Sequence, residues 1–294
     1  MRTKVHLKLI FNPAAGRGKA RRHIDEIVRY FISRGADVDV HASASPADLT
    51  RTAAVSSAAG FDRVVICGGD GTVHLAVRDF DLEHGVLAVV PLGSGDDFAR
   101  VTGVPRKLRA ACDVALDGRI REVDVALANG TRYLGVAGLG FDSEVAAHAQ
   151  NVKMLRGSLV YLYSILRVLP RFTPHRVSIR TENGAREEQI MFATVGNTRQ
   201  YGSGIRIVPA AQIDDGVLDY CIVHRTSRMQ LLLTLPLAYN GTHIRKPFVE
   251  TGRGREFHFE SERPLDVYAD GEFVTRTPVD FGLETGKLKV VTGN

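Results

Sequence analysis

The spacing of hydrophobic residues changes near residue 124 of the chain. Before that point, short apolar runs alternate with segments whose apolar residues recur every three or four positions. The runs at residues 8–11, 64–67 and 86–90 predict buried strands. Residues 20–34 predict a helix with one apolar face. Because strands alternate with helices, we predict an α/β domain with a parallel sheet covered on both sides.

After residue 124 the runs are short, alternate apolar and polar residues, and are bounded by Gly, Asn or Asp. Such runs predict the strands of a mostly antiparallel β-sandwich. They cover residues 133–137, 177–180, 190–195, 218–223, 256–260, 265–268 and 288–291. Residues 155–169 and 229–237 predict helices within this part. We therefore predict two domains, 1–124 and 125–294, with the last strand a candidate to pack back on the first domain.

The composition is that of a soluble globular protein, with 44% hydrophobic and 24% charged residues among 294. Cys67, Cys112 and Cys221 lie far apart in apolar runs, which favours reduced core thiols over disulfides or a zinc site. The start of the chain lacks the apolar region of a signal peptide, and no apolar run approaches membrane-spanning length. We therefore expect a cytoplasmic protein.

The formal net charge is +5, which favours polyanionic partners such as nucleotide phosphates, anionic lipid surfaces or nucleic acid. A modest positive charge also simply keeps a protein in solution. Charge alone does not choose between these interpretations.

The sequence Gly68-Gly69-Asp70-Gly71-Thr72 follows one of the buried runs directly and precedes a helical segment. Glycines allow positive φ angles and let backbone N–H groups approach phosphate oxygens closely, and the start of a helix favours the same anion. We interpret this sequence as a phosphate-binding loop, with a simple tight turn as the alternative. It is not a Walker A loop, and the Gly-Arg-Gly-Lys sequence at residues 16–19 lacks the Ser or Thr that such a loop requires.

Three glycine-bearing loops leave the ends of predicted parallel strands, at residues 12–16, 68–72 and 91–100. In an open parallel sheet, the carboxyl ends of the strands share one crevice where ligands bind. One ligand can therefore contact all three loops, as a nucleotide with a long phosphate chain requires.

These loops resemble the sequence elements of a known family. Residues 12–16, Asn-Pro-Ala-Ala-Gly, resemble the NPxxG element of the diacylglycerol kinase catalytic family, which includes bacterial lipid kinases and sphingosine kinases. Residues 68–72 match its GGDGT signature, and residues 93–100 resemble its GTxNDFAR element. The likeness continues through residues 138–142, 201–204, 209–219 and 270–272. The resemblance implies an α/β nucleotide domain and a β-sandwich domain, with the active site in the cleft between them.

The resemblance also implies ATP as the phosphate donor and identifies residues that bind it. These residues are Asn12, Gly16, Ser43, Gly68, Gly69, Asp70, Gly71, Thr72, Val73, His74 and Ser94. A structural Mg²⁺ is implied at the Asp215 carboxylate and the backbone carbonyls of Gln212 and Val217. Without the resemblance, Asp215 is an ordinary turn residue.

Glu272 matches the general base of the family, and Asp70 is expected near the catalytic Mg²⁺ of ATP. One carboxylate that accepts the hydroxyl proton is what phosphoryl transfer to an alcohol requires. Asp270-Gly271 alone would predict only a hairpin turn with Glu272 at its flank. Glu272 and Asp70 are therefore the predicted catalytic residues.

The chain departs from the family pattern at several positions. His74-Leu75 stands where Asn-Glu is commoner, and Ser94 replaces Thr. Asp96 replaces Asn and adds a carboxylate near the predicted phosphates, and no acidic residue follows Pro209. These departures bear on nucleotide affinity, metal use and activity.

The resemblance implies a lipid acceptor, with diacylglycerol as the first choice. Residues 155–169 form an apolar segment flanked by Arg156, Arg167 and Arg171, which suits acyl chains or a membrane interface as well as it suits a buried helix. We therefore predict an ATP-dependent lipid kinase that is peripheral at the inner membrane face, with no nucleic-acid partner and with a homodimer allowed. An NAD kinase-like enzyme for a soluble substrate and a catalytically impaired ATP- or lipid-binding protein are the alternatives.

Overall fold

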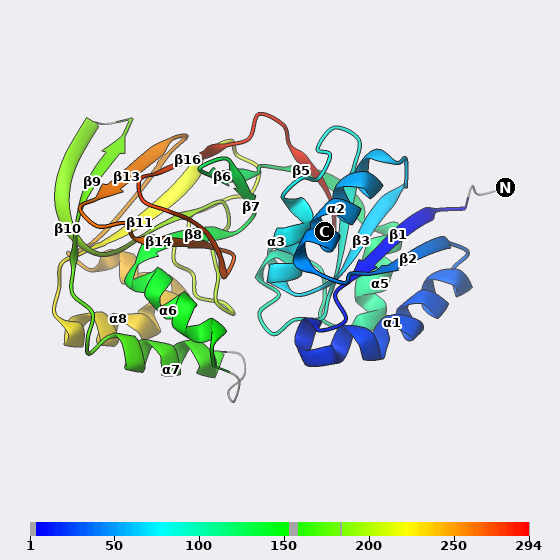
Figure 1. The fold of residues 1–294 in the computed structure, drawn as a ribbon, viewed down its shortest axis with the longest axis horizontal. Helices are drawn as coiled ribbons and strands as arrows, with labels where there is room; N and C mark the ends of the chain where they lie inside the picture. Colours follow the sequence, from blue (N-terminus) through cyan, green and yellow to red (C-terminus); the bar gives the residue numbers. More distant parts are fainter. Residues whose placement is uncertain (1–3, 153–157, 183, 294) are drawn as a thin grey trace. The chain divides into compact units, whose positions relative to one another are not determined.

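The computed structural model describes residues 4–152, 158–182 and 184–293 (Figure 1). The chain forms two compact units. The first unit contains Met1–Val123 and Thr285–Asn294, and the second contains Asp124–Glu284. None of the helices in the described part of the chain is long and apolar enough to cross a bilayer.

The first unit is built on a six-stranded sheet in the order β2-β1-β3-β4-β17-β5. All neighbours in this sheet are parallel except β17 and β5, which are antiparallel. The strands are β1 (His6–Phe11), β2 (Asp37–Ala42), β3 (Arg63–Gly68), β4 (Val86–Pro91), β5 (Arg119–Val123) and β17 (Leu288–Thr292). The helices are α1 (Ala15–Ser33), α2 (Pro46–Ala58), α3 (Asp70–Val77), α4 (Asp97–Val101) and α5 (Leu108–Asp117).

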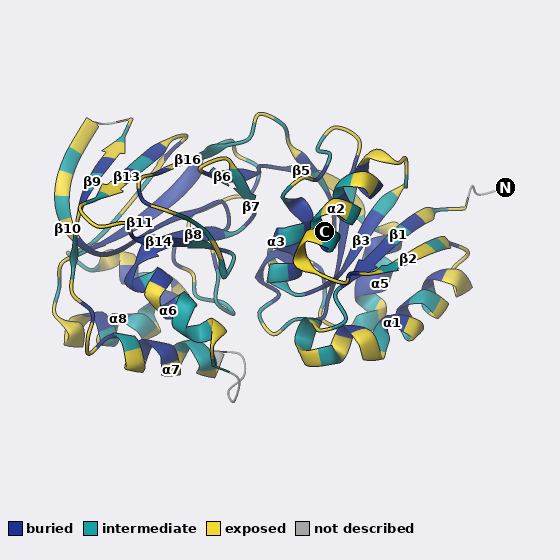
Figure 2. Cartoon of the chain, in the orientation of Figure 1, coloured by how far each residue is buried: buried dark blue, intermediate teal, exposed yellow. Residues whose placement is uncertain are grey.

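Local sequence explains where these elements lie. The apolar run of β3 is buried from Val64 to Gly68, as Figure 2 shows in dark blue. Helix α2 begins where the Ser45 side chain accepts a hydrogen bond from the Asp48 N–H at 3.1 Å, with Pro46 in the first turn. Helix α1 has positive φ angles at residues 16–18 and becomes regular only after them, which matches the helix predicted from residue 20.

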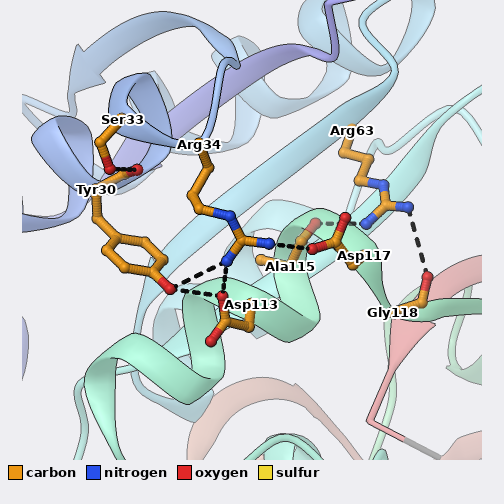
Figure 3. Close-up of polar contacts among 8 residues, drawn as sticks. All are labelled: Tyr30, Ser33, Arg34, Arg63, Asp113, Ala115, Asp117 and Gly118. Carbon is orange, nitrogen blue, oxygen red and sulfur yellow. Dashed lines mark hydrogen bonds and ion pairs between the residues drawn. The ribbon is translucent and has the colours of Figure 1, made fainter. Parts of the chain in front are cut away.

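Helices α1 and α5 are joined by a polar network that also reaches β3 (Figure 3). The Tyr30 hydroxyl donates to Asp113 at 2.6 Å, and Arg34 pairs with both Asp113 and Asp117. Arg63 of β3 donates to the carbonyl oxygen of Ala115 at 2.6 Å. The network therefore fixes α5 against its neighbours through both side-chain and backbone contacts.

The second unit contains an eleven-stranded antiparallel sheet. Nine strands follow the order β15-β14-β8-β10-β9-β13-β16-β6-β7, while β11 pairs with β10 and β12 pairs with β11. The strands are β6 (Ala126–Ala128), β7 (Thr131–Tyr133), β8 (Val136–Gly140), β9 (His175–Thr181), β10 (Gly184–Gly196), β11 (Leu218–His224), β12 (Val249–Gly254), β13 (Phe257–Ser261), β14 (Asp266–Ala269), β15 (Glu272–Arg276) and β16 (Val279–Leu283). The helices are α6 (Phe141–Gln150), α7 (Ser158–Val168), α8 (Arg228–Asn240) and the short 3₁₀ helix η1 (Thr242–Arg245).

Two apolar clusters stabilise the second unit. One lies among the strands and contains Tyr133, Phe259 and Phe281, whose rings make edge-to-face contacts. The other lies between the strands and the helices and includes Ile165 of α7 and Leu231 of α8. The second cluster therefore fixes the helices that line the pocket described below.

The predicted fold class is confirmed: a parallel α/β sheet and an antiparallel second unit. Strand β17, predicted at residues 288–291, belongs to the sheet of the first unit. Helix α6 was not predicted, because its buried residues Phe141, Ser143 and Val145 are two positions apart, which is the period of a strand. The predicted helix at residues 155–169 corresponds to α7, and its first three residues lie outside the described part of the chain.

Candidate functional site

The three glycine-bearing loops lie against one another at the carboxyl ends of β1, β3 and β4. The Leu92 N–H donates to the carbonyl oxygen of Gly68 at 2.9 Å. A Cβ atom added to Gly69 would lie 3.0 Å from the Cα of Gly93. A Cβ atom on Gly16 would lie 2.1 Å from the carbonyl oxygen of Leu92. The structure therefore brings these predicted loops together, and they approach closely because glycines stand at the contacts.

The glycine loop leads directly into a helix. Gly69 caps α3, and its carbonyl oxygen accepts the N–H groups of Thr72 and Val73 at 2.9 and 3.1 Å. A Cβ atom on Gly68 would lie 2.4 Å from the Thr72 hydroxyl oxygen, so this position has room only for glycine. The start of α3, with its positive dipole end, thus lies beside the loop. This geometry suits an anion.

Asp70 connects two of the loops. Its Oδ1 accepts a hydrogen bond from the Phe98 N–H at 3.2 Å, at the start of α4. The Asp70 carboxylate, which the sequence predicts to lie near the catalytic Mg²⁺, therefore also positions the third loop.

The carboxylate of Asp96, where the family pattern has Asn, is neutralised within the loop. The side chain is 4% exposed, its Oδ1 accepts the Gly93 N–H at 2.8 Å, and its Oδ2 lies 3.2 Å from Arg106. Arg106 also donates to the carbonyl oxygen of Ser94 at 2.8 Å. The extra negative charge is thus matched by an arginine that braces the same loop.

Three other residues predicted to bind the nucleotide lie in different surroundings. Asn12 accepts the Ala14 N–H at 2.9 Å, and the Ser43 N–H and hydroxyl both face the carbonyl oxygen of Phe11. Asn12 therefore follows β1, and Ser43, which follows β2, lies beside the end of β1. The His74 side chain is 1% exposed, with Nε2 3.5 Å from an Arg78 nitrogen, so its imidazole belongs to the interior of the first unit.

In the second unit, Asp215 forms an ion pair with Arg253. Its other oxygen, Oδ1, lies 3.4 Å from the Val217 N–H. A structural Mg²⁺ would require the carboxylate that the guanidinium already neutralises. As arranged, the predicted set of Gln212, Asp215 and Val217 does not fit that ion.

Among the described residues, one further group has spacing that could hold a metal: Glu188, His224 and Glu250. Arg186 donates to both oxygens of Glu250, at 2.6 and 2.7 Å, and pairs with Glu188. His224 lies between the two glutamates, 2.5 and 3.1 Å from them. We therefore interpret the group as an ion-pair network between neighbouring strands.

Glu272 is the first residue of β15 and follows the turn Asp270-Gly271, in which both φ angles are positive. The Asp270 carboxylate accepts three backbone N–H groups, of Leu134, Gly135 and Val136, at 2.9 to 3.2 Å. A carboxylate with three such donors is strongly fixed. Asp270 thereby fixes the hairpin that carries Glu272. The sequence signalled the turn but not these contacts.

An apolar pocket opens among α6, α7, α8 and the neighbouring strands of the second unit. It contains about 680 Å³ of space free of atoms, solvent at its mouth included. Its lining includes Phe141, Val145, Ile165, Phe192, Leu231, Leu235 and Ala238. A pocket with so apolar a lining suits an apolar ligand.

Two polar side chains line this pocket together. The Tyr201 hydroxyl donates to the Asp142 carboxylate, and burial raises the pKa of Asp142 to about 6 even though the tyrosine lowers it. Gly138 makes room for the carboxylate, since a Cβ atom there would lie 2.0 Å from Asp142 Oδ2. Asp142 and Tyr201 appeared in the sequence motifs without a role. They are 59 positions apart in the chain, so the sequence did not indicate that their side chains are in contact.

Comparisons with known proteins agree with this geometry. Residues 6–128 match the family model of the diacylglycerol kinase catalytic domain, and residues 135–292 match the YegS C-terminal NAD kinase beta sandwich-like domain. A diacylglycerol kinase of Mycobacterium tuberculosis (strain ATCC 25618 / H37Rv) is 32% identical, over 95% of this chain and 93% of its own. One of Bacillus subtilis (strain 168) is 26% identical, over 93% and 92%.

Solved structures from Bacillus anthracis str. Sterne share the fold. One superposes with a TM-score of 0.83 at 24% identity, covering 100% of this chain and 99% of its own. Another, of a diacylglycerol kinase, gives 0.76 at 22% identity, covering 100% and 98%.

Proposed function

The chain belongs to the diacylglycerol kinase family, and from this premise we propose that it transfers the γ-phosphate of ATP to a lipid hydroxyl. The acceptor is diacylglycerol and the product phosphatidic acid. The observation that carries the acceptor class is the apolar pocket of the second unit.

The first unit binds ATP in this proposal. The loops of Gly16, Gly69 and Gly93 pack closely, and the start of α3 offers N–H groups and a dipole to the phosphates. Asn12 and Ser94 lie in the loops that follow β1 and β4, and Ser43 follows β2 and contacts the end of β1. Thr72, Val73 and His74 are buried, so they contribute backbone and packing rather than side-chain contacts.

Asp70 offers a carboxylate at the start of α3, which is the ligand type that Mg²⁺ prefers. When bound with ATP, the ion neutralises charge on the phosphates. The loops contribute positioning, since phosphoryl transfer depends mainly on alignment and charge stabilisation.

Glu272 is the general base in this proposal. It is a half-buried carboxylate on a hairpin that Asp270 fixes through three N–H groups. A fixed carboxylate can accept the proton of an acceptor hydroxyl, and such groups contribute roughly 10²–10⁴-fold to rate. Glu272→Gln should therefore lose that factor in turnover while ATP affinity stays unchanged.

The pocket takes the acyl chains. Its apolar lining suits hydrocarbon, and Asp142 with Tyr201 supplies the polar contact that a glycerol backbone needs. A nicotinamide dinucleotide carries charge and many hydrogen-bonding groups, which this lining cannot satisfy. The pocket therefore favours a lipid over the NAD kinase alternative.

Exposed apolar residues on α7 and α8 support contact with a membrane surface (Figure 2). Leu159, Leu162 and Leu166 of α7 are 48–58% exposed, and Leu233 of α8 is 67% exposed. Arg167 and Arg228 lie exposed on the same helices. Apolar residues beside basic ones suit an anionic bilayer. In this proposal the protein therefore binds peripherally to the inner face of the membrane.

Label transfer from radiolabelled ATP tests the proposal. The protein, Mg²⁺ and vesicles that contain diacylglycerol should yield labelled phosphatidic acid, and Glu272→Gln should yield almost none while still binding ATP. Label in NADP would contradict the lipid assignment. ATP binding without transfer to diacylglycerol or to added NAD would support the catalytically impaired alternative.

A further inference from the structure

The turn that precedes β11 gathers carboxylates that are largely withdrawn from solvent. The side chains of Asp215 and Asp219 are 22% and 7% exposed. The buried Asp124 accepts the Gly216 N–H at 2.7 Å. Carboxylates in such surroundings need a cation or several hydrogen bonds, because desolvation of an unpaired charge is costly.

Arg253 supplies a positive charge to two of them. It lies on β12 directly opposite Asp219 in the strand register, with Nε 3.3 Å from Asp219 Oδ2. Its Nη2 pairs with Asp215. A guanidinium has five N–H donors in a fixed plane, so one arginine can serve two carboxylates at once.

We propose that the Arg253 guanidinium takes the place of a structural metal ion at Asp215, so that this turn is ordered without Mg²⁺. Each Asp215 oxygen has a partner, the guanidinium for Oδ2 and the Val217 N–H, at 3.4 Å, for Oδ1. Mg²⁺ demands an octahedral shell of oxygens, whereas arginine satisfies the same carboxylate by donating hydrogen bonds.

The turn matters because it is tied to the residue at which the second unit begins. The Asp124 N–H donates to the carbonyl oxygen of Ile213 at 2.7 Å, and Asn197 donates to the carbonyl oxygen of Asp124 at 2.9 Å. Arg253 therefore stabilises the turn that holds Asp124, the first residue of the second unit, in place.

This inference goes beyond the proposed function, and its test measures unfolding rather than phosphoryl transfer. The nucleotide-free protein should have the same Tm in EDTA and in millimolar MgCl₂. Arg253→Gln should lower the Tm in EDTA by roughly 2–4 °C, the shift expected for the loss of about 1 kcal/mol. Mg²⁺ should restore most of that loss, because Asp215 is then open to a metal ion.

The matched control is Arg255→Gln, which changes an exposed arginine two residues further along the chain, just after β12. The Tm of this variant should match that of the unsubstituted protein in both buffers. A wild-type Tm that rises with Mg²⁺, with the rise abolished by Asp215→Asn, would show a metal ion at this site and overturn the proposal. An Arg253→Gln protein that is equally destabilised in both buffers would also overturn it, since the arginine would then be an ordinary ion-pair partner.

A second measurement does not depend on the folding of the arginine variant. Titration with Mn²⁺, followed by electron paramagnetic resonance without nucleotide, should give the same binding for the wild type and Asp215→Asn. Weaker Mn²⁺ binding by Asp215→Asn would contradict the proposal.

Discussion

At the scale of single residues, the candidate sites depend on carboxylates whose surroundings differ. Asp96 is neutralised by Arg106, and Asp215 by Arg253. Asp142 accepts a hydrogen bond from the Tyr201 hydroxyl but lies in an apolar pocket, and its burial there raises its pKa. Because their surroundings differ, substitutions at or beside these carboxylates should have different effects on stability and on ATP binding.

Asp142 should make stability depend on pH. Its folded pKa of about 6 exceeds the ordinary value of 3.8, so the folded state binds the proton more tightly than the unfolded state does. Stability is therefore fully present below the unfolded pKa and falls as the pH rises through the folded pKa. Asp142→Asn should raise the free energy of unfolding by roughly 1–3 kcal/mol near pH 8, with the gain shrinking toward about pH 4.

Urea denaturation at several pH values measures this, with the exposed Asp25→Asn as the control for a change of net charge. A gain that is equal at all pH values would contradict the desolvation argument.

Arg106 should matter for ATP binding through Asp96. Arg106→Gln removes the partner of a carboxylate that is 4% exposed, although Arg106 itself is 58% exposed and screened by solvent. We expect a several-fold weaker ATP affinity, corresponding to about 1 kcal/mol. Asp96→Asn in the same protein should restore affinity, because it removes the unpaired charge and keeps an acceptor for the Gly93 N–H. Calorimetry should measure the affinity for ATP of the wild type, Arg106→Gln and the double variant. A double variant that binds ATP no more tightly than Arg106→Gln would refute this prediction.

At the scale of elements, the ends of strands and helices position the candidate catalytic residues. The glycine loop lies between β3 and α3, and Glu272 begins β15 after a turn that Asp270 ties to residues 134–136. The strand–loop–helix order around Gly68 was predicted from the sequence because it depends on neighbouring residues. The contacts of Asp270 were not, because they join residues about 135 positions apart in the chain.

Asp270→Ala should destabilise the second unit. It leaves three backbone N–H groups without their acceptor, and each buried donor left unsatisfied costs about 1–3 kcal/mol. We expect a loss of roughly 3 kcal/mol in total, since water partly replaces the carboxylate. Asp266→Ala on the neighbouring strand breaks an exposed ion pair with Arg276 and should cost no more than about 1 kcal/mol. Equal losses for the two variants, measured by urea denaturation, would exclude the proposed role of Asp270.

At the scale of the whole molecule, the chain builds one sheet from its two ends. Strand β17 (Leu288–Thr292) pairs with β4 and β5, so the sheet of the first unit joins strands that are separated in sequence by the whole second unit. Periodicity predicted most of the strands, and the ordered motifs predicted the family. The strand order and the partners of Arg253 and Asp142 depend on long-range packing, which local patterns do not encode.

In the proposed function, the apolar pocket of the second unit binds the lipid acceptor. Ala238 of α8 lines the pocket and is 5% exposed, so a larger side chain there should fill the space in which we propose that acyl chains bind. The loops proposed to bind ATP belong to the first unit, and their affinity for ATP should not change. A larger side chain at Ala238 should therefore weaken lipid binding and leave the affinity for ATP unchanged.

The most direct test of the lipid kinase assignment is the rate of label transfer from ATP to diacylglycerol in vesicles, measured for the wild type and Ala238→Phe. The wild type should form labelled phosphatidic acid. The variant, shown to be folded by its Tm, should lose at least about tenfold in kcat/KM for the lipid, equivalent to about 1.4 kcal/mol, with an unchanged Kd for ATP. A wild type that labels no lipid, or a variant as active as the wild type, would contradict the account.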